Sequence, residues 1–228
     1  AARSTSDMAL SRAIAFACVG VMSLLVASCK ATHEGDCSTS TAPKLPAEVL
    51  AKLADELPDP CMAVWVRRGF SLGQYMPTEK VRRFAEERFH EMVSASPYAY
   101  RIHSGFRSYH SQKTTFARWA EREKTKDPSI GQEEAERRAN TYSARPGESE
   151  HQLGTVFDIA YAEFHTFNLP NGSPFGKSCA GKWLRDNAHR FGFTMSYPYG
   201  KESLTCFVPE PWHWRYVGKT LANHLREN

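Results

Sequence analysis

The chain has 228 residues and a net charge of +4, and 41% of its residues are hydrophobic and 24% charged. This length suffices for one domain with a sizeable core, and the composition is that of an ordinary soluble globular protein, which excludes disordered and fibrous classes. The sequence has no basic stripe interleaved with aromatic residues and no finger-like cysteine spacing, so no nucleic-acid partner is expected.

The first part of the chain has the pattern of an export signal. Arg12 precedes an apolar run, residues 13–26, which leads into Ala27-Ser28-Cys29. The run is shorter than the ~20 residues that a membrane-spanning helix needs, and small residues before a cysteine are typical of bacterial lipoproteins. We therefore expect residues 1–28 to be a lipoprotein signal peptide and Cys29 to carry lipid, which anchors an exported protein to a membrane of the cell envelope. The alternative is a buried apolar helix followed by an ordinary cysteine.

Four cysteines would remain beside the lipidated one: Cys37, Cys61, Cys179 and Cys206. Their spacing fits no metal motif, and in an oxidising compartment four cysteines allow three pairings. We expect a Cys179–Cys206 disulfide first, because both residues lie in the C-terminal half. Buried free thiols are the alternative.

The polar residues 29–45 are expected to form a tether, followed by one domain over residues 46–228. The spacing of apolar residues, together with the prolines and glycines that interrupt helices and strands, predicts the elements of its first half. The expected elements are a helix over 46–57, a strand over 62–66, a helix over 79–93 capped by Thr78, a strand over 98–104, a turn over 105–108, a helix that carries Gln112 and Phe116, a surface loop over 123–131 around Pro128, and a helix over 132–140.

The second half of the domain alternates strands and helices. Gly154 is expected to allow a bend before the first of these strands. The expected elements are a strand over 155–161, a loop over 164–177, a helix over 180–191 that ends at Gly192, a strand over 193–197, a turn over 198–201, a strand over 212–217, and a helix over 221–227.

Two short stretches far apart in the sequence carry the chemistry. Residues 149–158, SEHQLGTVFD, and residues 210–214, EPWHW, together offer His151, Asp158, His213 and a further carboxylate, Glu210. Three nitrogen and oxygen ligands with an additional carboxylate are the inventory of a catalytic zinc site. If His213 were the only such residue, a histidine that is simply hydrogen-bonded in the core would be the favoured interpretation. The accompanying His151, Asp158 and Glu210 favour a metal site instead.

Three blocks resemble the VanY-like D-alanyl-D-alanine carboxypeptidases, which belong to a wider group of zinc peptidases that includes lysostaphin and the hedgehog signalling domain. The blocks are residues 104–112 (SGFRSYHSQ), 143–159 (SARPGESEHQLGTVFDI) and 210–218 (EPWHWRYVG). The sequence departs from the family in having Phe106 where tyrosine is common, and in a segment after Gln112 that is longer at residues 123–129.

The resemblance implies an α+β fold in which a small antiparallel sheet carries a zinc site and helices flank it. It also implies one Zn²⁺ per chain, held by His151, Asp158 and His213, with Glu210 as general base and acid. Arg107 would bind either the substrate carboxylate or the developing oxyanion, and Gln112 and Ser149 would make secondary substrate contacts.

The expected activity is removal of the C-terminal D-Ala from peptidoglycan stem peptides by a monomeric enzyme. Within the same class, an L,D-carboxypeptidase that cuts L-Lys-D-Ala or its equivalent in tetrapeptides is the alternative. The alternative from a different class is a zinc-containing binding lipoprotein without turnover, and the presence of both Glu210 and Arg107 argues against it.

Overall fold

A four-stranded antiparallel sheet forms the centre of the computed structural model, which describes residues 48–49, 52, 79–162, 167 and 174–227. The strands are β1 (Tyr100–Ser104), β2 (Val156–Tyr161), β3 (Phe193–Met195) and β4 (His213–Tyr216), in the spatial order β1-β2-β4-β3. The expected α+β class is therefore confirmed, and β4, the last strand in the chain, lies between β2 and β3.

One face of the sheet is covered by helices. These are α3 (Glu79–Ser94), α6 (Cys179–Asn187), which continues as the 3-10 turn η5 (Ala188–Phe191), and α8 (Lys219–Glu227). Their apolar side chains pack with alternate strand residues such as Phe157 and Trp214 in the main core. The Phe89 and Phe157 rings, for example, lie 5.5 Å apart between α3 and β2. Because side chains alternate along a strand, Asp158 faces away from this core.

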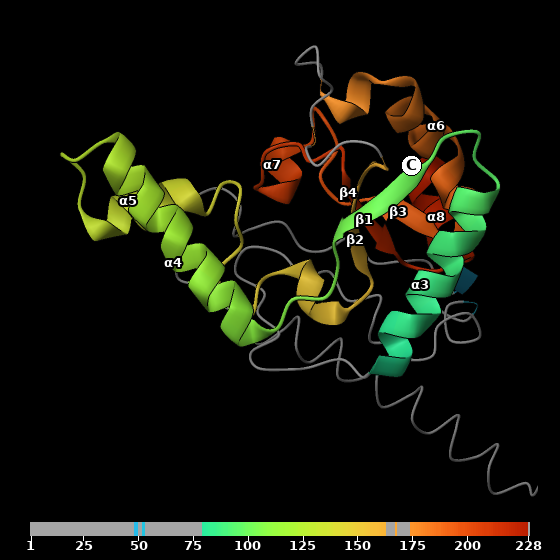
Figure 1. Cartoon of the computed structure of the whole chain (residues 1–228), viewed down its shortest axis with the longest axis horizontal. Helices are drawn as coiled ribbons and strands as arrows, with labels where there is room; N and C mark the ends of the chain where they lie inside the picture. The colour runs from blue at the N-terminus through green and yellow to red at the C-terminus, as the bar shows by residue number, and fades with distance from the viewer. Residues whose placement is uncertain (1–47, 50–51, 53–78, 163–166, 168–173, 228) are drawn as a thin grey trace, which may run out of the picture.

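A helical hairpin lies beside the sheet, on the side away from α3, α6 and α8 (Figure 1). It consists of α4 (Tyr109–Lys126) and α5 (Gln132–Ala139), and its own small apolar cluster contains Phe116, Ala120 and Ala139. Ser108 caps α4, because its side chain accepts a hydrogen bond from the Ser111 backbone N–H.

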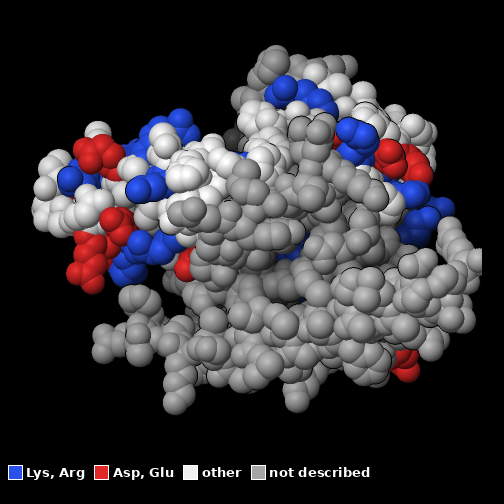
Figure 2. All heavy atoms as spheres, turned by 90° about the horizontal axis from the view of Figure 1, so that it is seen from below, with Lys and Arg blue, Asp and Glu red and all other residues white. Residues whose placement is uncertain are grey.

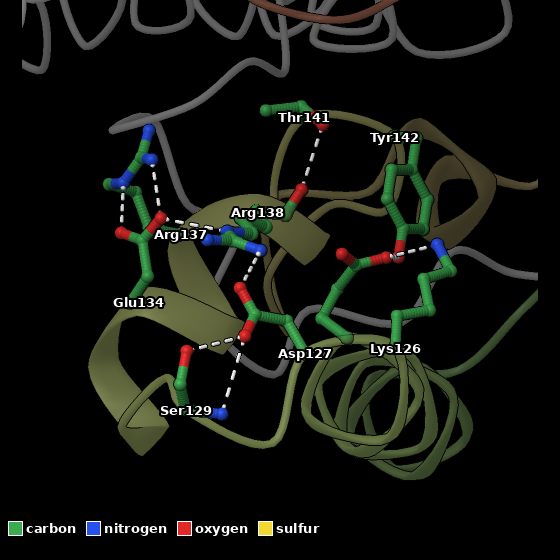
Figure 3. A network of polar contacts seen from close by, with 9 residues as sticks. Lys126, Asp127, Ser129, Glu134, Arg137, Arg138, Thr141 and Tyr142 are labelled. Carbon is green, nitrogen blue, oxygen red and sulfur yellow. Dashed lines mark hydrogen bonds and ion pairs between the residues drawn. The ribbon is translucent and has the colours of Figure 1, made fainter.

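The expected surface loop over residues 123–131 is wrong in its first part, because α4 continues to Lys126. Two contacts stabilise this extra helical turn: Lys126 and the Tyr142 hydroxyl both donate to Glu123 Oε1, and Figure 3 shows their side chains meeting there. Asp127 is the C-cap residue of the helix and immediately precedes Pro128. Beyond that turn, Arg138 donates to Asp127 and joins the two helices of the hairpin.

The expected disulfide between Cys179 and Cys206 is also wrong. Cys179 is a free, exposed thiol, whereas Cys206 is disulfide-bonded. Cys37 and Cys61 lie outside the described residues, as do the predicted signal peptide, lipid site, tether and strand over 62–66, and most of the predicted helix over 46–57. Among the described helices, none is both long and apolar enough to be a membrane span.

The other element predictions that fall on described residues are confirmed to within a few residues, with α7 (Glu202–Thr205) and the 3-10 turns η3 (Glu150–Leu153) and η4 (Phe175–Lys177) as additions. The predicted cap Thr78 and most of the predicted loop over 164–177 lie outside the described residues, and η4 replaces the end of that loop.

Candidate metal centre

His151, Asp158 and His213 come together as predicted. One ligand-capable atom from each residue lies within 4.8 Å of the others, and all three residues are buried. They come from three elements, η3, β2 and β4. Asp158 and His213 are direct partners in the β2–β4 register, so their side chains leave the sheet on the same face.

A left-handed glycine connects the first two of these residues. Gly154 follows η3 with φ +73°, a conformation that L-residues with a side chain rarely adopt. The chain turns there from the 3-10 helix into β2. The predicted bend at Gly154 is thus confirmed, and it lets residues seven positions apart in sequence face one point.

Hydrogen bonds orient both imidazole rings. His151 Nδ1 lies 2.6 Å from the Gly105 carbonyl oxygen, which can only accept, so Nδ1 carries the hydrogen and Nε2 has the lone pair. His151 Nε2 lies 3.4 Å from Asp158 Oδ2. On the other ring, Nε2 of His213 lies 3.0 Å from Glu150 Oε2, while Nδ1 lies 3.2 Å from Asp158 Oδ1. Each ring therefore turns one nitrogen toward Asp158 and the other toward a supporting group.

A buried pair behind His213 was not anticipated from the sequence. Glu150 also accepts a hydrogen bond of 2.7 Å from Arg215 Nη1, and both side chains are about 5% exposed or less. Burial alone would raise the pKa of Glu150, but Arg215 and His213 outweigh it and lower that pKa to about 2. The available signal was that Arg215 shares a strand face with His213, since a buried arginine needs an acceptor nearby.

Glu210 lies beside the cluster but is not part of it. Its Oε2 atom is 3.5 Å from His213 Nδ1. Burial raises the pKa of Glu210 to about 7, with the His213 charge opposing and the Asp158 charge assisting. A carboxyl group with a pKa near neutrality can both take and return a proton, which is the property that general acid–base catalysis requires.

Arg107 lines the same pocket as Glu210 and is held in place by hydrogen bonds. Its Nη1 donates to Gln112 Oε1 at 2.8 Å and its Nη2 to Ser104 Oγ at 3.2 Å. The amide of Gln112 in turn donates to the Ala144 carbonyl oxygen at 2.6 Å. Gln112 is therefore engaged at both ends of its side chain, and it positions the guanidinium group. Ser149, the other expected substrate contact, is buried and contributes to the pocket wall.

These groups line one pocket of about 440 Å³. It contains the three cluster residues together with Glu210, Arg107, Gln112 and Ser149, so every site residue predicted for metal binding or catalysis borders the same space. Trp212 also lines it and stacks on Phe167, with ring centroids 4.6 Å apart.

The cluster fits a divalent cation. Asp158 Oδ1 and His213 Nδ1 are buried side-chain atoms without a hydrogen-bond partner, although they face each other at 3.2 Å. Such orphaned atoms are uncommon in native proteins and often mark the site of an ion. A set of two imidazoles and one carboxylate suits zinc, which prefers nitrogen and oxygen ligands of this kind.

The fold and the site together define a metallopeptidase-like protein, with a metal cluster, an acid–base carboxyl group and an arginine in one pocket. Residues 78–219 match the family model "VanY: D-alanyl-D-alanine carboxypeptidase". The chain therefore belongs to the VanY family of D-alanyl-D-alanine carboxypeptidases.

Individual relatives agree with this assignment. "Putative carboxypeptidase YodJ" of Bacillus subtilis is 36% identical over 162 residues, which cover 70% of this chain and 54% of that protein. The chain thus spans about half the length of this relative. Among solved structures, "VanYB in complex with D-Alanine-D-Alanine" has a TM-score of 0.58 at 25% identity. The aligned region covers 73% of this chain and 92% of the VanYB chain. The "LdcB LD-carboxypeptidase" has a TM-score of 0.52 at 32% identity, covering 70% and 72% respectively.

Proposed function

We propose that this protein is a zinc-dependent carboxypeptidase that removes the C-terminal D-Ala from peptidoglycan stem peptides ending in D-Ala-D-Ala. The observation that carries the proposal is the shared pocket, in which Glu210 and Arg107 flank the buried cluster of His151, Asp158 and His213. Family membership supports it, as does the VanYB complex with D-Alanine-D-Alanine.

The metal would be held by His151 Nε2, His213 Nδ1 and an Asp158 carboxylate oxygen. A bound zinc ion supplies Lewis-acid polarisation of the scissile carbonyl and makes a water molecule more acidic. Glu210 accepts a proton on its carboxylate during attack by water and returns that proton to the amine of the departing D-Ala. Burial of the pocket strengthens each of these electrostatic interactions.

Arg107 supplies the positive charge that the substrate needs. A guanidinium group has five N–H donors in a fixed fork, and two of its nitrogens are already hydrogen-bonded to Gln112 and Ser104. The remaining donors are available either to the C-terminal carboxylate or to the oxyanion that develops at the carbonyl. The geometry is compatible with both roles.

A second candidate activity has a specific observation in its favour. The LD-carboxypeptidase LdcB shares this fold at 32% identity, so cleavage of D-Ala from a tetrapeptide is a reasonable competitor. Purified, zinc-loaded protein should be incubated separately with a pentapeptide ending in D-Ala-D-Ala and with the matching tetrapeptide. Release of D-Ala from the pentapeptide supports the proposed activity, release from the tetrapeptide alone supports the competitor, and release from neither refutes both.

Metal binding is tested independently of turnover. His151→Ala removes one of three ligands, so zinc content measured by atomic emission should fall well below one ion per chain. An exposed histidine on the same chain, His110, provides the matched control, because His110→Ala should leave zinc content unchanged. Equal zinc contents in the two variants would refute the assignment of the site.

We also propose that the protein is a lipoprotein of the bacterial cell envelope, attached through Cys29. The support is the sequence pattern of residues 12–29. Mass spectrometry of the protein from its native membrane should find a diacylated Cys29 at the mature N-terminus. An unmodified peptide that runs through residues 28 and 29 would contradict this.

A further inference from the structure

The pocket extends well beyond the metal cluster, along one face of α4. Gln112, Thr115, Arg118 and Trp119 all line it, and Tyr142 completes its far end. Residues three, six and seven positions after Gln112 lie along one side of a helix, so α4 forms a continuous wall. This wall exceeds what a single terminal D-Ala requires, and it provides room for the residues that precede the scissile bond.

The far end of this wall is rigidly built. The Trp119 and Tyr142 rings meet edge to face, with centroids 5.3 Å apart. Tyr142 is also fixed by its hydroxyl, which donates to Glu123 at 2.7 Å. The α4–α5 apolar cluster packs against both rings. The position of Arg118 is therefore supported by an ordered surface.

Arg118 differs from the other arginines of α4 and α5 in lining the pocket. Arg137, Arg138 and Arg145 form ion pairs with Glu134, Asp127 and Glu136. Within the described part of the chain, Arg118 has no such carboxylate, although acidic and basic side chains are interspersed over this end of the molecule (Figure 2). Arg122, also on α4, has no ion pair among the described residues either, but it lies over the Trp119 ring and does not line the pocket. The charge of Arg118 also acts on Arg107, whose pKa is lowered first by burial and further by that charge. The pocket thus contains two guanidinium groups, one beside the metal cluster and one farther along α4.

We propose that Arg118 binds a second carboxylate of the substrate, two or three residues upstream of the group bound by Arg107. Six residues of helix separate Arg118 from Gln112, the partner of Arg107, and this corresponds to ~9 Å along α4. An extended peptide covers that distance in about two to three residues. This inference rests on the proposed function, and it makes the enzyme selective for acidic stem peptides.

Two carboxylates of a stem peptide could satisfy Arg118. One is the side-chain carboxylate of a diamino diacid at the third position from the C-terminus, and the other is the free carboxylate of γ-linked D-Glu at the fourth. Both present the same planar acceptor to a guanidinium fork. Four synthetic pentapeptides separate these sources: either diaminopimelate or lysine at the third position, each combined with either D-Glu or its amide at the fourth.

The experiment compares KM values of the unmodified protein, Arg118→Gln and a charge-matched control, Lys113→Gln. Lys113 is exposed on the same helix and does not line the pocket. Arg118→Gln should raise KM about 3- to 30-fold for peptides with the recognised carboxylate, as for loss of one partly exposed charged hydrogen bond. The same change should have much less effect on peptides in which that carboxylate is absent, and Arg118→Lys should restore part of the selectivity. Lys113→Gln should leave the ratio between peptides as it is in the unmodified protein.

The outcomes separate this inference from the proposed function. If the unmodified protein releases D-Ala but Arg118→Gln changes KM equally for all four peptides, or for none, the role of Arg118 is refuted and the proposed function stands. If the unmodified protein releases D-Ala from no peptide, the proposed function is refuted and this inference with it.

Discussion

Glu150 Oε2 lies 3.0 Å from His213 Nε2, in a part of the molecule where neither side chain is more than 4% exposed. Because the carboxylate can only accept here, the ring hydrogen stays on Nε2 and the lone pair of Nδ1 points into the metal cluster. Arg215 balances the charge of Glu150 from the same strand as His213. This contact therefore sets which nitrogen of His213 is available to a metal.

Glu150→Gln should weaken zinc binding about 10- to 100-fold, since supporting groups behind a metal histidine typically contribute that much. Zinc affinity is measured by competition with a chromophoric chelator. The variant also leaves Arg215 buried without its counter-charge, which destabilises the fold. The double variant Glu150→Gln with Arg215→Gln should regain stability but not zinc affinity, and Glu133→Gln on the surface of α5 serves as control. Unchanged zinc affinity in both Glu150 variants would contradict the role.

Glu210→Gln should lower kcat by about 100-fold or more while zinc content stays close to that of the unmodified protein. Glutamine preserves the shape of the side chain but cannot take up a proton. A D-Ala release assay combined with atomic emission measures both quantities. A non-catalytic binding protein would instead show no D-Ala release in either form, and loss of zinc from Glu210→Gln would place Glu210 among the ligands.

Gly154→Ala should destabilise the protein by about 1–2 kcal/mol, because φ +73° is costly for a residue with a side chain. Gly105→Ala is the matched comparison in the same site. A methyl group there meets Ile102 and Phe157 only at ordinary contact distance, 3.9 Å. Urea unfolding of the two variants should therefore give the lower midpoint for Gly154→Ala. Equal midpoints would contradict strain at residue 154.

Glu123→Ala should lower the melting temperature by about 2–4 °C at pH 7, in keeping with the loss of about 1 kcal/mol in a protein of this size. The substitution leaves the Tyr142 hydroxyl and Lys126 without their acceptor.

The same pair of proteins tests the pH dependence. Hydrogen bonds from Lys126 and Tyr142 lower the pKa of Glu123 below its ordinary value of 4.5. The ionised Glu123 carboxylate therefore stabilises the folded protein fully above pH 4.5, and this contribution is lost as the pH falls through the folded-state pKa. Melting curves at several pH values should therefore show the difference between the two proteins shrinking below pH 4.5. A difference that stays constant down to pH 3 would contradict this.

Local patterns predicted most of the fold. Alternation along residues 155–161 and the stripe of Ala85, Phe89 and Met92 each indicate an element whose period is visible over a few residues. The metal residues could also be predicted, because two short blocks together offer histidines and carboxylates, the groups of a catalytic zinc site. Their three blocks also resemble a family with a specific motif.

Contacts between distant segments were harder to predict. The pairing of Glu150 with Arg215 joins residues 65 positions apart, and neither residue departs from an ordinary pattern in its own segment. The end of α4 was predicted wrongly because Pro128 and the polar residues around it indicate a loop. The contacts of Glu123 that extend the helix involve Tyr142 and become visible only in three dimensions. The Cys179–Cys206 pairing failed for the same reason, since nearness in sequence does not establish nearness in space.

The position of β4 between β2 and β3 has a consequence for how the metal centre forms. Asp158 and His213 are opposite each other only in the register seen here, and a slip of one residue would turn one of them to the other face of the sheet. A metal ion that needs both residues would stabilise the correctly paired sheet and no slipped alternative. Metal binding would thus select the correct strand register, and it can occur only after β4 has paired with β2.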